Sequence, residues 1–465
     1  MLRFTNLTQA NEIGANSYLL HLAPDSAVLL DAGMHPKNEG YDALPLLDLV
    51  HSTPLRSIFI SHAHHDHTGT LPLYQRQHTS VPVFMTEATA CLTETLLHNS
   101  VEVMSKQRTT VHPEYPLYTH KEITRISKRW QLCSLGRHYD LQGDPATPKE
   151  TCTFRFHDAG HILGSTAIEF TVQNKKVLYT GDINLSSQTL MFPARLPHIR
   201  WDLLIIEATR GENTSAPTIH REQIINHFIT RIREVFERDG SILIPCFALG
   251  KTQETLTLLY HAQLQGQLPP TPIYIGGLSK AFTEIYDRLA HRSPRAHPDL
   301  HIQRQIQPRL LDGRTAHNFR PAPRTIYLLS SGMMTPKTLS NFLAPHFLND
   351  PRHAIFFIGY CDPESPAGRL LHSVNTSTAS PPSISLDEEE EPLPVHCSVE
   401  HFDLTAHAQG YDLLQYILQT NPRHCILVHG DPAALQNLKQ SIHTSAPHIN
   451  VIIPPPRESI EIDLD

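Results

Sequence analysis

The feature that most constrains this chain is the stretch His62-Ala63-His64-His65-Asp66-His67, which directly follows an apolar run at residues 57–61. Five of its six side chains can bind a metal. Because side chains alternate along an extended segment, we expect His62 and His64 to project to one side, while Asp66 and His67 follow where the chain must turn. One cation could take the first pair and a second cation the other pair.

The kinds of donor in this stretch indicate which metal it suits. Imidazole nitrogen and carboxylate oxygen, without thiolate, favour a catalytic zinc site with an open coordination position over a closed structural site. A tract rich in His can also be a solvated loop, and the chain carries 32 His. The buried strand predicted before the stretch favours the metal site over that alternative.

Other metal-binding residue types follow other predicted strands. Asp31 comes after a strand at residues 26–30, where it is either a turn carboxylate or a group that orients a metal-binding His. His161 lies in a loop of small residues after a predicted strand and is expected to be a further ligand. Asp182 follows a strand at residues 176–180, and such a carboxylate can bridge two cations with its two oxygens.

Three later residues join this set. Glu207 ends the apolar strand predicted at residues 203–206. His407 and His429 follow strand-like segments nearer the end of the chain. Acidic and imidazole side chains therefore follow predicted strands at several places along the sequence.

The pattern of predicted strands and helices changes after residue 209. A strand followed by a helix recurs, and this rhythm predicts a small parallel α/β domain of its own. The predicted elements are a helix at 220–238, then strand-helix pairs at 241–252 and beyond, 272–290, 325–342 with its helix from Met333, and 354–371. Residues 372–394, which include the acid run at 387–391, are expected to form a mobile surface loop without a chemical role.

The net charge and the cysteines limit which binding partners and which cellular compartment fit the chain. A net charge of -8 gives the chain no global attraction to nucleic acid, so a polyanion site would be a local patch helped by bound cations. The 7 cysteines are scattered without a Cys-x-x-Cys pair, which favours a reducing compartment. No signal-like N-terminus and no apolar run of membrane length is present, so a cytoplasmic protein without a membrane partner is expected.

In their order along the chain, these residues resemble a known family. Asp31, the His62–His67 stretch, His161 and Asp182 are similar to the four motifs of the metallo-β-lactamase fold. The later set, namely Glu207, His407 and His429, resembles motifs A, B and C of its β-CASP branch, and residues 245–254, 331–334 and 359–369 resemble the inserted domain of that branch. The resemblance implies an α/β protein: an αββα metallo-β-lactamase sandwich, at 1–209 and 392–465, with an inserted α/β β-CASP domain at 210–391. It also implies an active site in the cleft between them.

The resemblance assigns roles residue by residue. One zinc would be held by His62, His64 and His161, the other by Asp66, His67 and His429, with Asp182 as the bridge and Asp31 as the group that orients a ligand. Catalysis falls to Asp66, Asp182, Glu207 and His407, where His407 gives a proton to the leaving ribose oxygen and Glu207 holds its imidazole. His407 as a zinc contact or a phosphate binder stays open. Ser330, Ser331, Gly332 and Arg369 are expected to hold substrate phosphates, although a Ser-Ser-Gly segment is more often only a turn.

The resemblance implies a function as well. Because His at motif C marks the RNA-cleaving members of the branch, His429 implies a zinc-dependent ribonuclease that hydrolyses phosphodiester bonds with a hydroxide activated by two metals. Single-stranded RNA is the expected substrate, and a homodimer stays open. Endonuclease action is preferred to exonuclease action, because no pocket for a 5′ end can be read from the sequence.

Three other functions remain as alternatives: a DNA nuclease of the same fold, a hydrolase of small esters, and a non-catalytic RNA-processing scaffold. The chain also departs from the family pattern. Residues 11–17 lack the Thr-Gly-Ser of close bacterial relatives, and Thr209-Arg210-Gly211 stands where Thr-Tyr-Gly is usual. The chain is further expected to lack the extra RNA-binding or dimerising domain of several relatives. All predicted ligands are present, so these departures bear on the choice of substrate.

Overall fold

The computed structural model describes residues 1–23, 26–51, 53–108, 112–147, 150–311, 319–376, 381–387 and 391–464. The chain divides into two compact units. Unit 1 comprises Met1–Ser187, Met191–Ala216 and His407–Asp465, and unit 2 comprises Gln188–Leu190 and Pro217–Ala406. Each unit has its own sheets and its own core.

Unit 1 contains two seven-stranded sheets. The first has the order β22-β1-β2-β3-β4-β5-β6. Its strands, in that order, are Ser459–Ile462, Leu2–Asn6, Tyr18–Ala23, Ser26–Leu30, Leu55–Phe59, Val83–Met85 and Gln131–Leu132. The second sheet has the order β21-β20-β11-β10-β9-β8-β7. Its strands, in that order, are Asn450–Ile452, His424–Val428, Leu203–Glu207, Lys175–Tyr179, Thr166–Val172, Cys152–Asp158 and His138–Asp140.

An aromatic core joins the two sheets of unit 1. It takes side chains from β1, β2 and β4 of one sheet and from β8, β9 and β10 of the other. The Phe59 ring lies with its centroid 4.8 Å from that of Phe154 and 5.0 Å from that of Phe170, both edge-to-face. Edge-to-face contacts between aromatic rings stabilise the packing beyond what their buried area alone contributes. This layer therefore holds the two sheets against each other.

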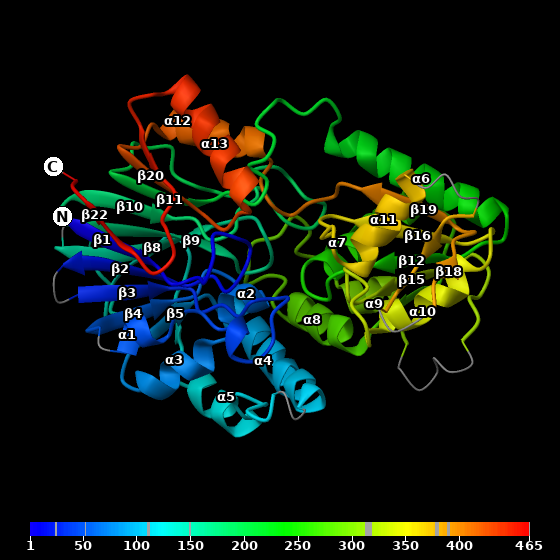
Figure 1. The fold of residues 1–465 in the computed structure, drawn as a ribbon, viewed down its shortest axis with the longest axis horizontal. Coiled ribbons are helices and arrows are strands. Elements are labelled where there is room, and N and C mark those ends of the chain that lie inside the picture. The colour runs from blue at the N-terminus through cyan, green and yellow to red at the C-terminus, as the bar shows by residue number, and fades with distance from the viewer. Residues whose placement is uncertain are drawn as a thin grey trace. The chain divides into compact units, whose positions relative to one another are not determined.

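Helices cover the outer face of each sheet (Figure 1). The unit 1 helices are η1 (Gly40–Ala43), α1 (Asp48–His51), α2 (His65–Thr68), α3 (Leu71–Gln77), α4 (Glu87–Gln107), α5 (His120–Ser127), α12 (Gly410–Thr420) and α13 (Pro432–Ser445). Helices α3, α4 and α5 share a buried cluster with the first sheet, and α12 and α13 share one with the second. The layers are helix, sheet, sheet and helix, so the αββα prediction is confirmed.

Unit 2 is built on a six-stranded sheet with the order β14-β13-β15-β12-β16-β19. All its strand pairs are parallel, as the strand-helix rhythm predicts. The strands, in that order, are Arg309–Leu310, Ile273–Ile275, Ile326–Leu329, Ile242–Pro245, Ala354–Ile358 and Ser398–Phe402. The helices are α6 (Arg221–Glu237), α7 (Lys251–Leu264), α8 (Gly277–Arg288), α9 (Ile302–Ile306), α10 (Leu339–Leu348) and α11 (Pro366–Thr376).

Two details of unit 2 differ from the sequence-based expectation. The helix expected from Met333 begins only at Leu339, because Met334 and Lys337 have φ of 53° and 65°, outside the helical region. Within residues 372–394, expected to be a loop, α11 continues to Thr376 and two short strands pair antiparallel, β17 (Ser383–Ile384) with β18 (Leu393–Pro394). Most of the acid run, residues 388–390, lies outside the described residues.

The expected domain limits at 209/210 and 391/392 remain predictions. By contacts, the units divide at Ala216 and again before His407. The later division arises because β19 pairs with β16 of the unit 2 sheet before the chain returns to unit 1. No helix in the described ranges combines the length and the hydropathy needed to cross a membrane.

Candidate metal centre

Strand ends of unit 1 bring the predicted donors together. Asp31 follows β3, His161 lies three residues beyond β8, and Asp182 lies three residues beyond β10. The stretch predicted from the sequence leaves β4 as irregular backbone through His64 and then turns into the short helix α2, which holds Asp66 and His67. Because β3 and β4 belong to one sheet and β8 and β10 to the sheet packed against it, the ends of these strands bring residues distant in sequence together.

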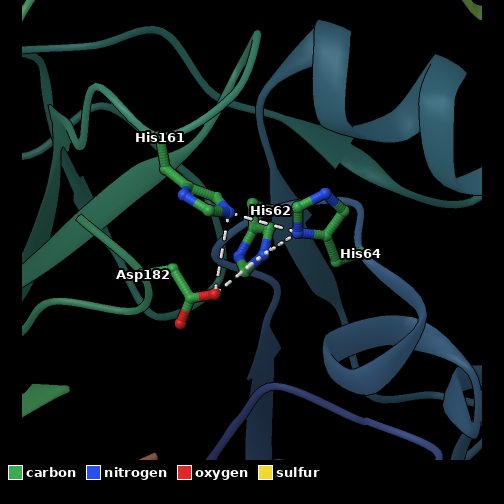
Figure 2. A group of neighbouring side chains, drawn as sticks. All are labelled: His62, His64, His161 and Asp182. Atoms are coloured by element: carbon green, nitrogen blue, oxygen red, sulfur yellow. Dashed lines mark hydrogen bonds and ion pairs between the residues drawn. The ribbon is translucent and has the colours of Figure 1, made fainter. Parts of the chain in front are cut away.

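The first cluster consists of His62, His64, His161 and Asp182, whose ligand atoms all lie within 4.8 Å of one another. His64 Nδ1 lies 3.1 Å from His62 Nε2 and 3.1 Å from His161 Nε2. Asp182 Oδ2 lies 3.5 Å from His62 Nε2 and 3.7 Å from His161 Nε2. Figure 2 shows the three rings and the carboxylate directed at a common point.

These separations fit a tetrahedral zinc site. Zinc–nitrogen bonds of about 2.0 to 2.1 Å in a tetrahedron place the ligand atoms roughly 3.3 to 3.4 Å apart. The 3.1 to 3.7 Å distances of the first cluster lie around that value. The donor set of three imidazoles and one carboxylate is one that zinc accepts.

The second cluster consists of Asp66, His67 and His429. Asp66 Oδ2 lies 3.3 Å from His429 Nε2 and 3.6 Å from His67 Nε2. His429 follows β20 with φ of 50°, a left-handed conformation that is uncommon for a residue with a side chain. His65, the remaining imidazole of the stretch, belongs to none of the groups found among the described residues.

Asp182 faces both clusters with different oxygens. Its Oδ2 is the oxygen near His62 and His161, whereas its Oδ1 lies 3.4 Å from His67 Nε2 and 3.0 Å from His429 Nδ1. Close as it is to these nitrogens, Oδ1 is buried and accepts no hydrogen bond of good geometry from any described residue. A buried carboxylate oxygen without such a bond is costly unless a cation or another polar group satisfies it. This arrangement suits a carboxylate that bridges two cations.

Burial and charge set the protonation of the imidazoles. Burial lowers the pKa of His62 well below its ordinary value and lowers the pKa of His64 to about 4. Burial also acts to lower the pKa of His67 and His429, but Asp182 and the other nearby carboxylates outweigh it and raise both. His62 and His64 of the first cluster therefore present neutral rings, while the second cluster carries protons that offset the charge of its carboxylates.

The same charges act on the carboxylates. Burial acts to raise the pKa of Asp182, but His429, His67 and His62 outweigh it, and the pKa is well below its ordinary value. The pKa of Asp66 is lowered too, because His67 and His429 outweigh its burial. Both carboxylates are ionised at neutral pH and are ready to bind a cation.

Asp31 is a buried acceptor behind the second cluster. Its Oδ2 accepts hydrogen bonds from His67 Nδ1 at 2.8 Å and from the Tyr179 hydroxyl at 2.5 Å. Ser61 also donates to Asp31 twice, from its backbone N–H to Oδ1 and from its hydroxyl to Oδ2, both at 2.7 Å. Of the two alternatives for Asp31, this geometry favours the group that orients a ligand, because it leaves His67 Nε2 for a metal.

Glu207 and His407 form a pair beside Asp182. His407 Nδ1 lies 3.0 Å from Glu207 Oε2 and 4.0 Å from Asp182 Oδ2. Glu207 Oε1 accepts a hydrogen bond from the Ile183 N–H at 2.7 Å, which fixes the carboxylate. His407 is 20% exposed, so a substrate can reach its ring. These three residues and His429 also form a third group of possible ligands, so both roles for His407 remain open.

The four residues expected to hold substrate phosphates lie in unit 2. Ser330, Ser331 and Gly332 form the turn after β15, where Ser331 Oγ accepts a hydrogen bond from the Thr335 N–H at 2.9 Å. Arg369 lies on α11 and donates from its guanidinium to the Glu364 carbonyl at 2.8 Å. Their contact with substrate stays a prediction.

The sequence-based prediction did not include several supporting residues. Asn16 and Tyr179 reach the centre from positions far from the residues they contact, so only the folded chain brings them there. Thr209 Oγ1 lies 2.9 Å from His429 Nδ1, and its place two residues after the strand-end Glu207 is a usable signal in the sequence. Ser61 directly precedes the His stretch and could have been included with it.

Three family models match the chain in succession. The metallo-beta-lactamase superfamily matches residues 10–224, the Beta-Casp domain matches residues 252–370, and the Zn-dependent metallo-hydrolase RNA specificity domain matches residues 392–454. The first match contains most of the donors described above, and the third contains His407 and His429.

Curated relatives match nearly the whole chain at low identity. They include cleavage and polyadenylation specificity factor 73 of Drosophila melanogaster, 27% identical over 95% of this chain and 62% of the relative. Endoribonuclease YSH1 of Candida glabrata is 26% identical over 100% of this chain and 60% of the relative. Subunit 3 of the cleavage and polyadenylation specificity factor of Dictyostelium discoideum is 27% identical over 100% of this chain and 58% of the relative. The chain thus spans about three fifths of the length of these relatives.

A solved structure supports the fold alone. The crystal structure of a protein of unknown function from Enterococcus faecalis V583 matches with a TM-score of 0.55 at 12% identity, covering 99% of this chain and 100% of that one. The sandwich, the donor clusters and the successive matches agree with one another. The chain therefore belongs to the metallo-β-lactamase fold with β-CASP and RNA specificity domains, and it is a distant homologue of the endoribonucleases of the cleavage and polyadenylation factor 73 and Ysh1 type.

Proposed function

We propose that this chain is a ribonuclease that binds two Zn²⁺ and hydrolyses phosphodiester bonds within single-stranded RNA. The observation that carries the proposal is Asp182, whose two oxygens face two separate donor clusters beside the Glu207–His407 pair. A single structural zinc needs neither a bridging carboxylate nor an acid–base pair next to it.

The residues that would hold the metals follow from the two clusters. His62, His64 and His161 would hold one zinc, and Asp66, His67 and His429 the other, with Asp182 shared. When bound, zinc supplies Lewis acidity that activates water and stabilises the charge developing on phosphorus. Burial of these ligands keeps bulk water from competing for them.

His407 is the proposed proton donor to the leaving ribose oxygen. Its Nδ1–H donates to Glu207, so the proton for the substrate comes from Nε2 of a doubly protonated ring. The Glu207 carboxylate stabilises that charged ring, and its own bond from the Ile183 N–H holds it in place. The His407 side chain is 20% exposed, which gives the substrate access to it.

Three observations support RNA over DNA. The RNA specificity domain model matches residues 392–454, and curated relatives that match the chain are named endoribonucleases. His429, the residue that the family resemblance ties to RNA cleavage, lies in the second cluster, 3.3 Å from Asp66 Oδ2. Cutting within the strand is proposed on the names of those relatives.

Matched oligonucleotides test the proposal. Purified, zinc-loaded protein is incubated with single-stranded RNA and DNA of the same sequence, each labelled at either end. We expect internal cuts in RNA and intact DNA with the wild-type chain, and no cuts in either with Asp66→Ala. Stepwise shortening from one end would replace the endonuclease with an exonuclease, and cleavage of DNA alone would overturn the choice of substrate. Intact RNA with two zinc ions bound would overturn the function itself.

A further inference from the structure

Asn16 is a buried residue in the connection between β1 and β2, two residues before the start of β2. It is fully buried, although a side-chain amide is costly to bury without partners. Its partners lie in the second cluster of the metal centre.

The backbone of Asn16 holds the turn that carries Asp66. Its N–H donates to the Asp66 carbonyl at 2.9 Å, and its carbonyl accepts from the Gly33 N–H at 2.8 Å. A Cβ on Gly33 would lie 1.8 Å from the Asp66 carbonyl oxygen, so the three backbone segments pack without room for a side chain. The position of residue 66 is therefore tied to residue 16.

The side-chain amide of Asn16 reaches two metal-binding atoms. Its Nδ2 lies 3.3 Å from Asp66 Oδ2 and 3.2 Å from His67 Nε2. His67 Nδ1 is already paired with Asp31, so Nε2 is the nitrogen left for a metal, which must displace the proton that Nε2 carries in the metal-free ring. The amide lies against the atoms of the second cluster that would bind the cation.

Tyr18 fixes the orientation of this amide. The Tyr18 hydroxyl donates to Asn16 Oδ1 at 3.0 Å, which turns the amide NH2 group toward Asp66 and His67. Tyr18 is 1% exposed and belongs to the aromatic core between the sheets, so its ring is held firmly. Among the described residues, the hydrogen bonds of the amide to metal-binding side chains go to Asp66 and His67 alone.

We propose that Asn16 is a positioning residue for the second cluster, and that it sets the metal affinity of that cluster while leaving the first unchanged. This inference rests on the proposed two-zinc site. Groups that orient metal ligands change affinity by about 10- to 100-fold when they are removed. The effect is expected in one of two binding steps, which a general loss of stability would not produce.

Cobalt titration of the metal-free protein tests this assignment. Co²⁺ absorption and calorimetry resolve the binding steps of the wild-type chain, and His64→Ala and His67→Ala show which step belongs to which cluster. Asn16→Ala should weaken the second-cluster step by about 10- to 100-fold and leave the first-cluster step and its spectrum unchanged. Equal affinities in wild type and variant, or equal weakening of both steps, would overturn the proposal.

Two further variants keep the test decisive. Asn6→Ala is the matched control, because Asn6 is a buried Asn at the end of β1 whose amide contacts Asn11 and Pro454. It should leave both steps unchanged. If Asn16→Ala fails to fold, the isosteric Tyr18→Phe removes only the bond that orients the amide, and should weaken the second-cluster step by about 2- to 10-fold. An unchanged second step in Tyr18→Phe would then overturn the proposal.

The titration is separate from the cleavage assay. A wild-type chain that binds two Co²⁺ but cuts no RNA would overturn the proposed ribonuclease, while the effect of Asn16 on the second step would still decide this inference. A wild-type chain that binds a single Co²⁺ would overturn the inference directly.

Discussion

The two donor clusters of unit 1 lie side by side, yet they are built differently. The first is three imidazoles with one oxygen of Asp182, and burial keeps its His62 and His64 rings neutral. The second contains the additional carboxylate of Asp66, and the pKa of its imidazoles is raised by the surrounding acids. His62 and His64 can accept a cation as they stand, whereas in the second cluster a cation must displace protons.

Supporting side chains hold both clusters, and in the first Ser61 Oγ lies 3.0 Å from His62 Nδ1. Ligands of the second cluster are supported by Asp31, Asn16 and Thr209, each through a hydrogen bond to a ring or a carboxylate. Such support fixes ring orientation and tautomer. The comparison teaches that the second cluster depends on side chains that the fold brings in from distant parts of the chain.

Removing a ligand from the second cluster should give the largest effect. Asp66→Ala or His67→Ala should abolish RNA cleavage, by about 10⁴-fold or more, because a two-metal hydrolysis loses one of its cations. Cleavage rates, zinc content and circular dichroism measured together check this. Asp42→Ala, which removes an exposed carboxylate of the same unit, serves as the control. A variant lacking Asp66 that cuts at the wild-type rate would contradict the two-metal account.

Removing the proposed proton donor should have a smaller effect. His407→Ala should slow cleavage by about 10²- to 10⁴-fold while the protein keeps two zinc ions, because the ring acts on the leaving group rather than on the metal. His448→Ala is the matched control, since His448 is an exposed imidazole of unit 1 bonded to Asn421. Loss of one zinc from His407→Ala would instead make His407 a ligand, together with Asp182 and Glu207.

Local patterns of the sequence were enough to predict most donors of this centre. The His62–His67 stretch and the acids at strand ends are visible without a structure, because strand ends and side-chain types are local properties. The αββα layers followed from the family resemblance and are confirmed. The contact of Asn16 with Asp66 spans 50 positions, and that of Tyr179 with Asp31 spans 148, so no local pattern could indicate them.

Other features depended on packing that the sequence does not show. The pairing of β19 with β16 delays the return of the chain to unit 1, a consequence of sheet register rather than of composition. The start of α10 at Leu339 depends on left-handed residues at Met334 and Lys337, neither of which is a Gly. Tertiary packing thus decided where these helices and domains begin and end, while residue types indicated which side chains could bind a metal.

Zinc stoichiometry followed together with RNA cleavage tests the central claim most directly. Metal-free protein is reloaded with increasing zinc, bound zinc per chain is measured by mass spectrometry, and the cleavage rate is recorded at each step. The account predicts two zinc ions per chain at saturation, with cleavage appearing as the second ion binds. Full cleavage at one zinc per chain, or cleavage that survives complete removal of metal, would contradict it.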